Sequence, residues 1–97
     1  MEQEVIRFFK SFKFDNSEIE SIVNICDMVR YANVDEMTDN CKLLVKYGYP
    51  RSELDFLILS NPKFLVADLK ELESEIKELV KNGEDLEEIL KQNPCAI

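Results

Sequence analysis

The stretch that decides the fold is Ser52–Gly83, SELDFLILSNPKFLVADLKELESEIKELVKNG. Its first part spaces apolar residues as in a helix, and Ser52 is suited to cap this helix together with Asp55. Pro62 ends the helix, because its ring removes a backbone N–H and disfavours the helical conformation at Asn61. We therefore predict a first helix that begins at Ser52 and ends at Asn61.

The second part of the stretch predicts a short turn and a longer helix. Residues 63–66 are too few for a full α-helix and favour a single 3₁₀ turn. Asp68 is placed to cap the next helix, with Glu71 completing the capping box, and Gly83 ends it. This helix should span Leu69–Asn82. Its apolar residues recur at the spacing of one helical face: Leu69, Leu72, Ile76, Leu79 and Val80.

The same pattern occurs upstream and, in part, downstream. Residues 17–48 align with residues 52–83 without a gap at a shift of 35 positions. Residues 84–97 form a partial third copy with a second Asn-Pro pair. Repeats of this length with two helices each are typical of an α-solenoid; the alternative is chance similarity between two amphipathic helix pairs. The first-copy residues that are identical in the second are Ser17, Glu18, Ala32, Glu36, Lys42, Leu44, Val45, Lys46 and Gly48.

Three features of the repeat are shared with a known family. The stretch NPKFL at residues 61–65, the apolar stripe that ends at Gly83 and the Asn-Pro pair at residues 93–94 resemble the repeat of the mitochondrial transcription termination factor (mTERF) family. The resemblance covers residues 17–97 and is strongest over residues 52–94. It implies a right-handed solenoid with two α-helices and a 3₁₀ turn per repeat. It also implies a basic concave face that binds nucleic acid in organelle gene expression.

We predict an all-α fold in a single domain over residues 1–97: a short right-handed α-solenoid of about two and a half helix–turn–helix repeats plus an N-terminal capping helix. The capping helix, Glu2–Lys13 within residues 1–14, falls in register with the second helix of each repeat. Basic residues interleave with its phenylalanines, so a helix lying on a membrane surface is the alternative. The remaining helices should span Glu18–Val29, Asp35–Tyr47 and Asp85–Gln92. Core positions are expected at Ile22, Val23, Met37, Cys41, Leu44, Leu57, Ile58, Leu72, Ile76 and Leu79.

The composition indicates an acidic binding module without catalytic chemistry. The 97 residues carry a formal net charge of −8 and include no histidine. This charge favours basic partners and disfavours nucleic acid and anionic membranes. The chain has no Gly-rich phosphate loop, no activating partner for a cysteine and no metal-ligand spacing, so we expect no enzymatic activity, cofactor or metal. It departs from the mTERF pattern in its acidity, in its short array and in having Cys26 and Asp27 where an Asn-Pro pair would stand.

The cysteine pattern bears on the cellular compartment. Cys26, Cys41 and Cys95 form an odd set without a CxxC pair, and because the first predicted helix begins at once with acids at Glu2 and Glu4, we expect no signal peptide. These features predict three free thiols in a reducing cytoplasm. Cys41 occupies an apolar stripe position and is expected to lie in the core.

Five basic residues form a candidate nucleic-acid contact, called here the basic column. Arg7, Lys42 and Lys77 share one register position of the repeat, and Lys46 and Lys81 share another. Stacked repeats would align these residues, and in the mTERF family columns of this kind contact phosphates. Alternatively, they are ordinary surface residues that pair with neighbouring acids.

Two further groups are candidates for contacts. Tyr31, Tyr47 and Tyr49 either stack on bases or cover the edge of the core. The C-terminal end lacks the helix that would complete the third copy, so apolar surface should be exposed there, open to a partner or to a second copy of the chain. The residues expected at this end are Ile89, Leu90, Ala96 and Ile97.

We interpret the chain as a non-enzymatic helical-repeat module that binds another protein. This interpretation rests on the acidic charge, the short array and the absence of catalytic groups. The alternative is a nucleic-acid-binding module of the transcription termination factor type, which rests on the family resemblance and the basic column.

Overall fold

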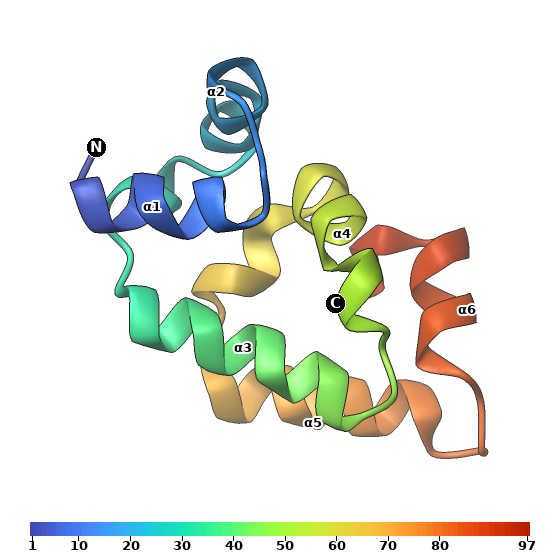
Figure 1. The fold of residues 1–97 in the computed structure, drawn as a ribbon. Helices are drawn as coiled ribbons and strands as arrows, with labels where there is room; N and C mark the ends of the chain where they lie inside the picture. Colours follow the sequence, from blue (N-terminus) through green and yellow to red (C-terminus); the bar gives the residue numbers. More distant parts are fainter.

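The computed structural model describes residues 1–97 and contains six α-helices, four 3₁₀ turns and no β-strand (Figure 1). The all-α prediction is therefore confirmed. None of the helices is both long enough and apolar enough to cross a lipid bilayer. The elements in chain order are α1 (Gln3–Ser11), α2 (Asn16–Ile25), η1 (Asp27–Tyr31), α3 (Val34–Lys46), η2 (Arg51–Glu53), α4 (Leu54–Ser60), η3 (Pro62–Val66), α5 (Leu69–Val80), α6 (Leu86–Gln92) and η4 (Pro94–Ala96).

Elements at the same position of successive sequence repeats are neighbours in space. Helix α1 contacts α3 and α3 contacts α5, while α2 contacts α4 and η1 contacts η3. Figure 1 shows α3 (green) and α5 (orange) side by side, with α3 between α1 and α5. The dimensions of 40 × 23 × 19 Å are those of a body extended in one direction.

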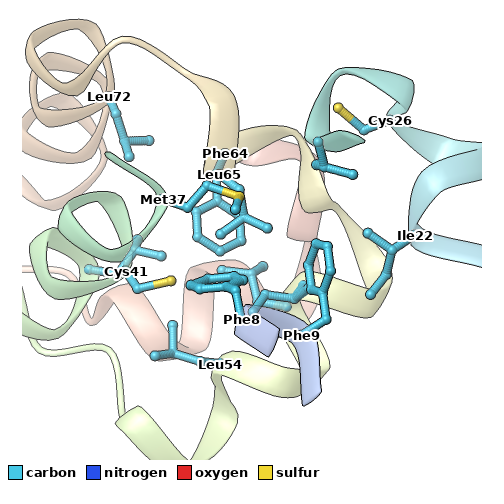
Figure 2. Close-up of a cluster of buried hydrophobic side chains, with 14 of the residues drawn as sticks. Phe8, Phe9, Ile22, Cys26, Met37, Cys41, Leu54, Phe64, Leu65 and Leu72 are labelled. Atoms are coloured by element: carbon cyan, nitrogen blue, oxygen red, sulfur yellow. The ribbon is translucent and has the colours of Figure 1, made fainter. Parts of the chain in front are cut away.

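One hydrophobic cluster of 23 buried residues extends through the molecule from Val5 in α1 to Leu90 in α6. Figure 2 shows a part of it, in which side chains from α1, α3, α4 and η3 converge. Burying this much apolar surface is the main favourable contribution to folding. All the predicted core positions except Leu79 are buried: Ile22, Val23, Met37, Cys41, Leu44, Leu57, Ile58, Leu72 and Ile76.

The apolar stripe predicted for α5 is correct at its centre and wrong at its ends. Leu72 and Ile76 are 1% and 0% exposed, but Leu79 is only partly buried and Leu69 is 43% exposed. Helix α5 packs against α3 and α6, and a helix buries only the residues that face its neighbours. The exposed fractions show that these contacts are centred on Leu72 and Ile76.

One of the two predicted helix caps is present. The side chain of Asp68 accepts a hydrogen bond from the backbone N–H of Glu71, as predicted, and Asn33 accepts one from the N–H of Glu36 at the equivalent position of the preceding repeat. The predicted cap at Ser52 is wrong, because this residue lies inside η2 and α4 begins at Leu54 without a side-chain cap. The carbonyl of Pro50 accepts the first hydrogen bond of η2.

The helix predicted to run to Val29 ends earlier. Helix α2 ends at Ile25, Cys26 has extended backbone with φ −139°, and η1 follows. Asn61 is extended in the same way, with φ −153°, at the equivalent position of the next repeat. The first repeat therefore makes the same break without an Asn-Pro pair. Val29 in η1 and Phe64 in η3 are equivalent and are 0% and 1% exposed, so each turn buries the side chain at this position.

Two buried asparagines bind the turns η3 and η4 from positions 24 to 36 residues earlier in the chain. Asn40 of α3 is 2% exposed and Asn61 is 4% exposed. Because the last carbonyls of a short helical turn lack donors within the turn, they need partners from outside. Asn40 Nδ2 donates to the end of η3, to the carbonyls of Phe64 (2.8 Å), Leu65 (3.2 Å) and Ala67 (2.9 Å). Asn61 Nδ2 donates to the end of η4, to the carbonyls of Pro94 (2.9 Å) and Ile97 (3.2 Å).

Candidate functional site

All five residues of the basic column are exposed. Arg7 is on α1, Lys42 and Lys46 are on α3, Lys77 is on α5 and Lys81 follows α5 directly. They are therefore carried by neighbouring helices. Arg7, Lys42 and Lys77 take part in none of the salt bridges of the structure.

The other two lysines of the basic column are paired with carboxylates. Lys81 pairs with Glu78 on the preceding turn, and Lys46 Nζ lies 3.6 Å from Glu73 Oε2 and 5.7 Å from the centre of the Tyr47 ring. The Tyr47 hydroxyl donates to Glu73 Oε2 at 2.8 Å. This hydrogen bond is the main reason why the pKa of Glu73 is lowered and the pKa of Tyr47 is raised. The group of Lys46, Tyr47 and Glu73 therefore joins α3 to α5 as a polar cluster.

The three tyrosines have different environments. Tyr49 is 2% exposed and its hydroxyl donates to the carbonyl of Glu53 at 3.1 Å, so stacking on a base is excluded for it and the core-edge interpretation is correct. Burial raises the pKa of Tyr49 to about 12, and the nearby carboxylates act in the same direction. Tyr47 belongs to the polar cluster with Glu73. Tyr31 is 79% exposed and is the only one of the three that belongs to the exposed class.

The predicted apolar end is less open than expected. Leu90 is 0% exposed and belongs to the hydrophobic cluster, so its assignment to a partner surface is wrong. Ile89, Ala96 and Ile97 are partly buried. The two hydrogen bonds from Asn61 hold the last turn against the molecule, and α6, which contacts α5, buries Leu86 together with Leu90.

The surface feature that the sequence did not reveal is a pair of adjoining clefts beside η1 and η3. One has a volume of about 360 Å³ and the other about 430 Å³, and they share Glu36, Val66 and Ala67. We call the pair the acidic groove. Its remaining lining residues are Met28, Tyr31, Ala32, Asn33 and Leu65 in the first cleft, and Asp39, Asn40, Asp68 and Leu69 in the second.

The acidic groove combines exposed apolar side chains with carboxylates. Met28 is 66% exposed, Tyr31 79% and Leu69 43%, although large apolar groups of this kind are usually buried. Every charged residue that lines the groove is an acid, namely Glu36, Asp39 and Asp68. Such a surface suits a ligand that offers apolar groups beside positive charges.

The sequence held one signal of this groove. Met28 and Tyr31 are large apolar residues in a segment that contains no long helix, and three acids follow within the next eight positions. The predicted helix Glu18–Val29 included Met28 but not Tyr31, so the two residues were not placed on a common turn. Only the packing of η1 against η3 brings them beside Val66.

The three cysteines are free, as predicted, and only Cys95 is exposed. Burial raises the pKa of Cys41 to about 12, against the opposing effect of the Arg51 guanidinium. Because the thiolate is the reactive form, we expect Cys41 to be inert in the folded protein. At pH 8 a disulfide reagent such as dithionitrobenzoate should titrate one thiol in the native protein and all three in guanidinium chloride. Cys95→Ser should remove the native signal; a persisting rapid reaction would contradict the burial of Cys26 and Cys41.

The geometry contains no group of three or more histidine, cysteine, aspartate or glutamate side chains placed to hold a metal ion. The chain matches no family model, no curated protein and no solved structure. Any function assigned to it therefore rests on its own geometry and charge.

Proposed function

We propose that the chain is a non-enzymatic helical-repeat module that binds another protein by taking a basic, partly apolar segment of that partner into the acidic groove. The observation that carries this proposal is the lining of the groove, where Met28, Tyr31 and Leu69 are exposed and every charged residue is an acid. Its three free cysteines fit a reducing cytoplasm, which is the compartment we propose.

The proposed architecture is a short right-handed α-solenoid of about two and a half repeats, closed at one end by α1, of the kind that the mTERF family builds. Contacts between equivalent elements support it, since α1, α3 and α5 adjoin in order and η1 adjoins η3. Solenoids commonly bind partners along surfaces made from equivalent elements of successive repeats. The acidic groove is such a surface, because η1 and η3 both contribute to it.

Apolar contact and charge would have separate roles in the proposed complex. A partner side chain seated against Met28, Tyr31 and Val66 would remove apolar surface from water, which supplies most of the affinity. Lysine or arginine residues beside it would meet Glu36 and Asp39 and set the partner's orientation and association rate. The net charge of −8 favours approach of the same kind of segment.

The test uses a fluorescent peptide in which leucine and phenylalanine alternate with lysine and arginine. We expect Glu36→Gln with Asp39→Asn to weaken its binding about tenfold or more, and Tyr31→Ser to weaken it at unchanged stability. The matched control, Glu84→Gln with Glu88→Gln, makes the same change in net charge away from the groove and should have little effect. Fluorescence anisotropy at two salt concentrations measures the affinity of each variant for the peptide. Equal losses in both double variants, or no binding of the peptide, would overturn the proposal.

One observation favours nucleic acid as the second candidate ligand, namely that Arg7, Lys42 and Lys77 have no salt-bridge partner. Phosphate contacts would give an affinity for RNA or DNA that falls steeply with salt. The triple variant Arg7→Glu, Lys42→Glu, Lys77→Glu tests this at little cost in stability, because surface pairs contribute about 0–1 kcal/mol each. Loss of a tight, salt-sensitive interaction with RNA or DNA in that variant would replace the protein-binding proposal.

A further inference from the structure

A third cleft lies on a different part of the molecule, between α1, α3 and the start of α4. Its volume is about 370 Å³, which is within the range of small-molecule sites. Phe8, Cys41 and Leu54 are buried and form its floor, and Figure 2 shows these three side chains converging. Partly buried Phe12 and Val45 form apolar walls. We call it the basic cleft, for the charges at its rim.

The charges around the basic cleft are of one sign. Lys42 and Arg51 line it, and no acid does, although the chain as a whole carries −8. Neither Lys42 nor Arg51 takes part in a salt bridge. The influence of Arg51 reaches the floor, because its guanidinium acts to lower the pKa of Cys41 there. An anion in the cleft would thus meet two unpaired cations above an apolar surface.

The repeat supplies an internal comparison for this site. A shift of 35 positions takes Ser11, Thr38 and Cys41 of the basic cleft to Lys46, Glu73 and Ile76 at the α3–α5 junction. That junction holds the polar cluster, in which Glu73 accepts a hydrogen bond from the Tyr47 hydroxyl and forms a salt bridge with Lys46. At the α1–α3 junction the side chains of Ser11, Thr38 and Cys41 are each shorter than their counterparts, and the cleft is open there.

Lys42 is the cation at the α1–α3 junction, and it lacks the nearby carboxylate that its counterpart has. Its counterpart Lys77 lies near enough to Glu73 to lower the pKa of that carboxyl group. The residue at the position of Glu73 in the first repeat is Thr38, which has no carboxylate. The α1–α3 junction therefore has the same cation as the α3–α5 junction and apolar surroundings, but it has no carboxylate at the position of Glu73.

We propose that the basic cleft binds a small amphiphilic carboxylate, whose carboxylate group takes the place that Glu73 fills in the next repeat and whose apolar chain lies on Phe8, Leu54 and the walls. Lys42 and Arg51 bind the carboxylate through charge-assisted hydrogen bonds. The apolar chain displaces water from the floor and walls. Because both parts contribute to binding, the ligand must carry the carboxylate and the apolar chain in one molecule. This site is independent of the acidic groove, since the two share no residue.

The test uses decanoate below its micelle concentration, with acetate and decanol as probes that carry only the charge or only the chain. We expect decanoate to shift the backbone amide signals of Thr38, Cys41 and Leu54 in ¹H–¹⁵N spectra of the whole chain. Acetate and decanol should bind at least about tenfold more weakly, because each lacks one half of the interaction. Equal binding of decanol, or shifts confined to the acidic groove, would overturn the proposal.

Three variants distinguish the effect of charge from the effect of filling the cleft in the same experiment. Lys42→Gln with Arg51→Gln should weaken decanoate binding about tenfold or more, since charge-assisted contacts are lost. Thr38→Glu places the chain's own carboxylate in the cleft and should abolish binding while keeping the thermal midpoint unchanged or raising it. Thr38→Gln, which fills the same space without charge, should reduce binding less. Tighter binding of an acidic amphipathic peptide than of decanoate at these residues would show a protein-binding surface instead and reject the small-ligand site.

Discussion

Replacing Ile76 by alanine is expected to lower the free energy of unfolding by about 2–4 kcal/mol. The side chain is 0% exposed and belongs to the hydrophobic cluster at the α3–α5 junction. The cost has two parts, the lost transfer of apolar atoms from water and the cavity that remains because the surroundings relax only in part. Urea denaturation measures the change. The free energy of unfolding should depend on urea concentration with the same slope in both proteins, which shows that both unfold in comparable two-state transitions.

Two other alanine variants on the same helix are the controls. Leu69 is 43% exposed, so Leu69→Ala should change the free energy of unfolding by less than about 0.5 kcal/mol. Leu79 is only partly buried, and Leu79→Ala should fall between the two. Equal losses at Leu69 and Ile76 would mean that α5 presents a different side to α3.

Replacing Asn40 by alanine is the second change with a large expected effect, about 2–4 kcal/mol of destabilisation. Its amide donates to three carbonyls at the end of η3, and each buried polar group left without a partner costs about 1–3 kcal/mol. Glu75 is the matched control, because it occupies the same position of the next repeat and is exposed. Glu75→Ala should change stability by less than about 0.5 kcal/mol, as chemical denaturation of both variants would show.

Asn40→Asp sharpens this test by making the effect depend on pH. A carboxylate at this position would be buried and would face carbonyl oxygens, so its pKa in the folded state should be raised. A neutral carboxyl group can still donate one hydrogen bond, whereas the ionised group cannot. The variant should therefore lose stability relative to the wild type as the pH rises from about 4 to about 7. A difference that does not vary with pH would show that Asn40 does not face those carbonyls.

Much of the helix pattern could be predicted because its signals are local. Asn33 and Asp68 act on backbone groups three residues away, and Pro62 acts on its immediate neighbours. Where the signal was not local, the prediction failed. The end of α2 at Ile25 has no proline to mark it, and the break there accompanies the burial of Val29.

The candidate sites were predicted less well than the helices. The basic column was recognisable from the repeat register, but the register did not show that Lys46 is paired with Glu73 while Lys42 has no such partner. Leu90 was assigned to an exposed end and is buried. Neither the acidic groove nor the basic cleft was predicted, because each joins residues from segments that are distant in the sequence.

The sequence by itself determined that the chain is helical and where several of its helices begin or end, since periodicity, caps and proline act over a few residues. Tertiary structure alone decided which side chains are enclosed, because burial depends on what packs against a residue from elsewhere in the chain. Leu69 and Ile76 make the distinction plain. Both belong to the apolar stripe predicted for α5, yet Leu69 is 43% exposed and Ile76 is 0% exposed, because only Ile76 faces the elements packed against the helix.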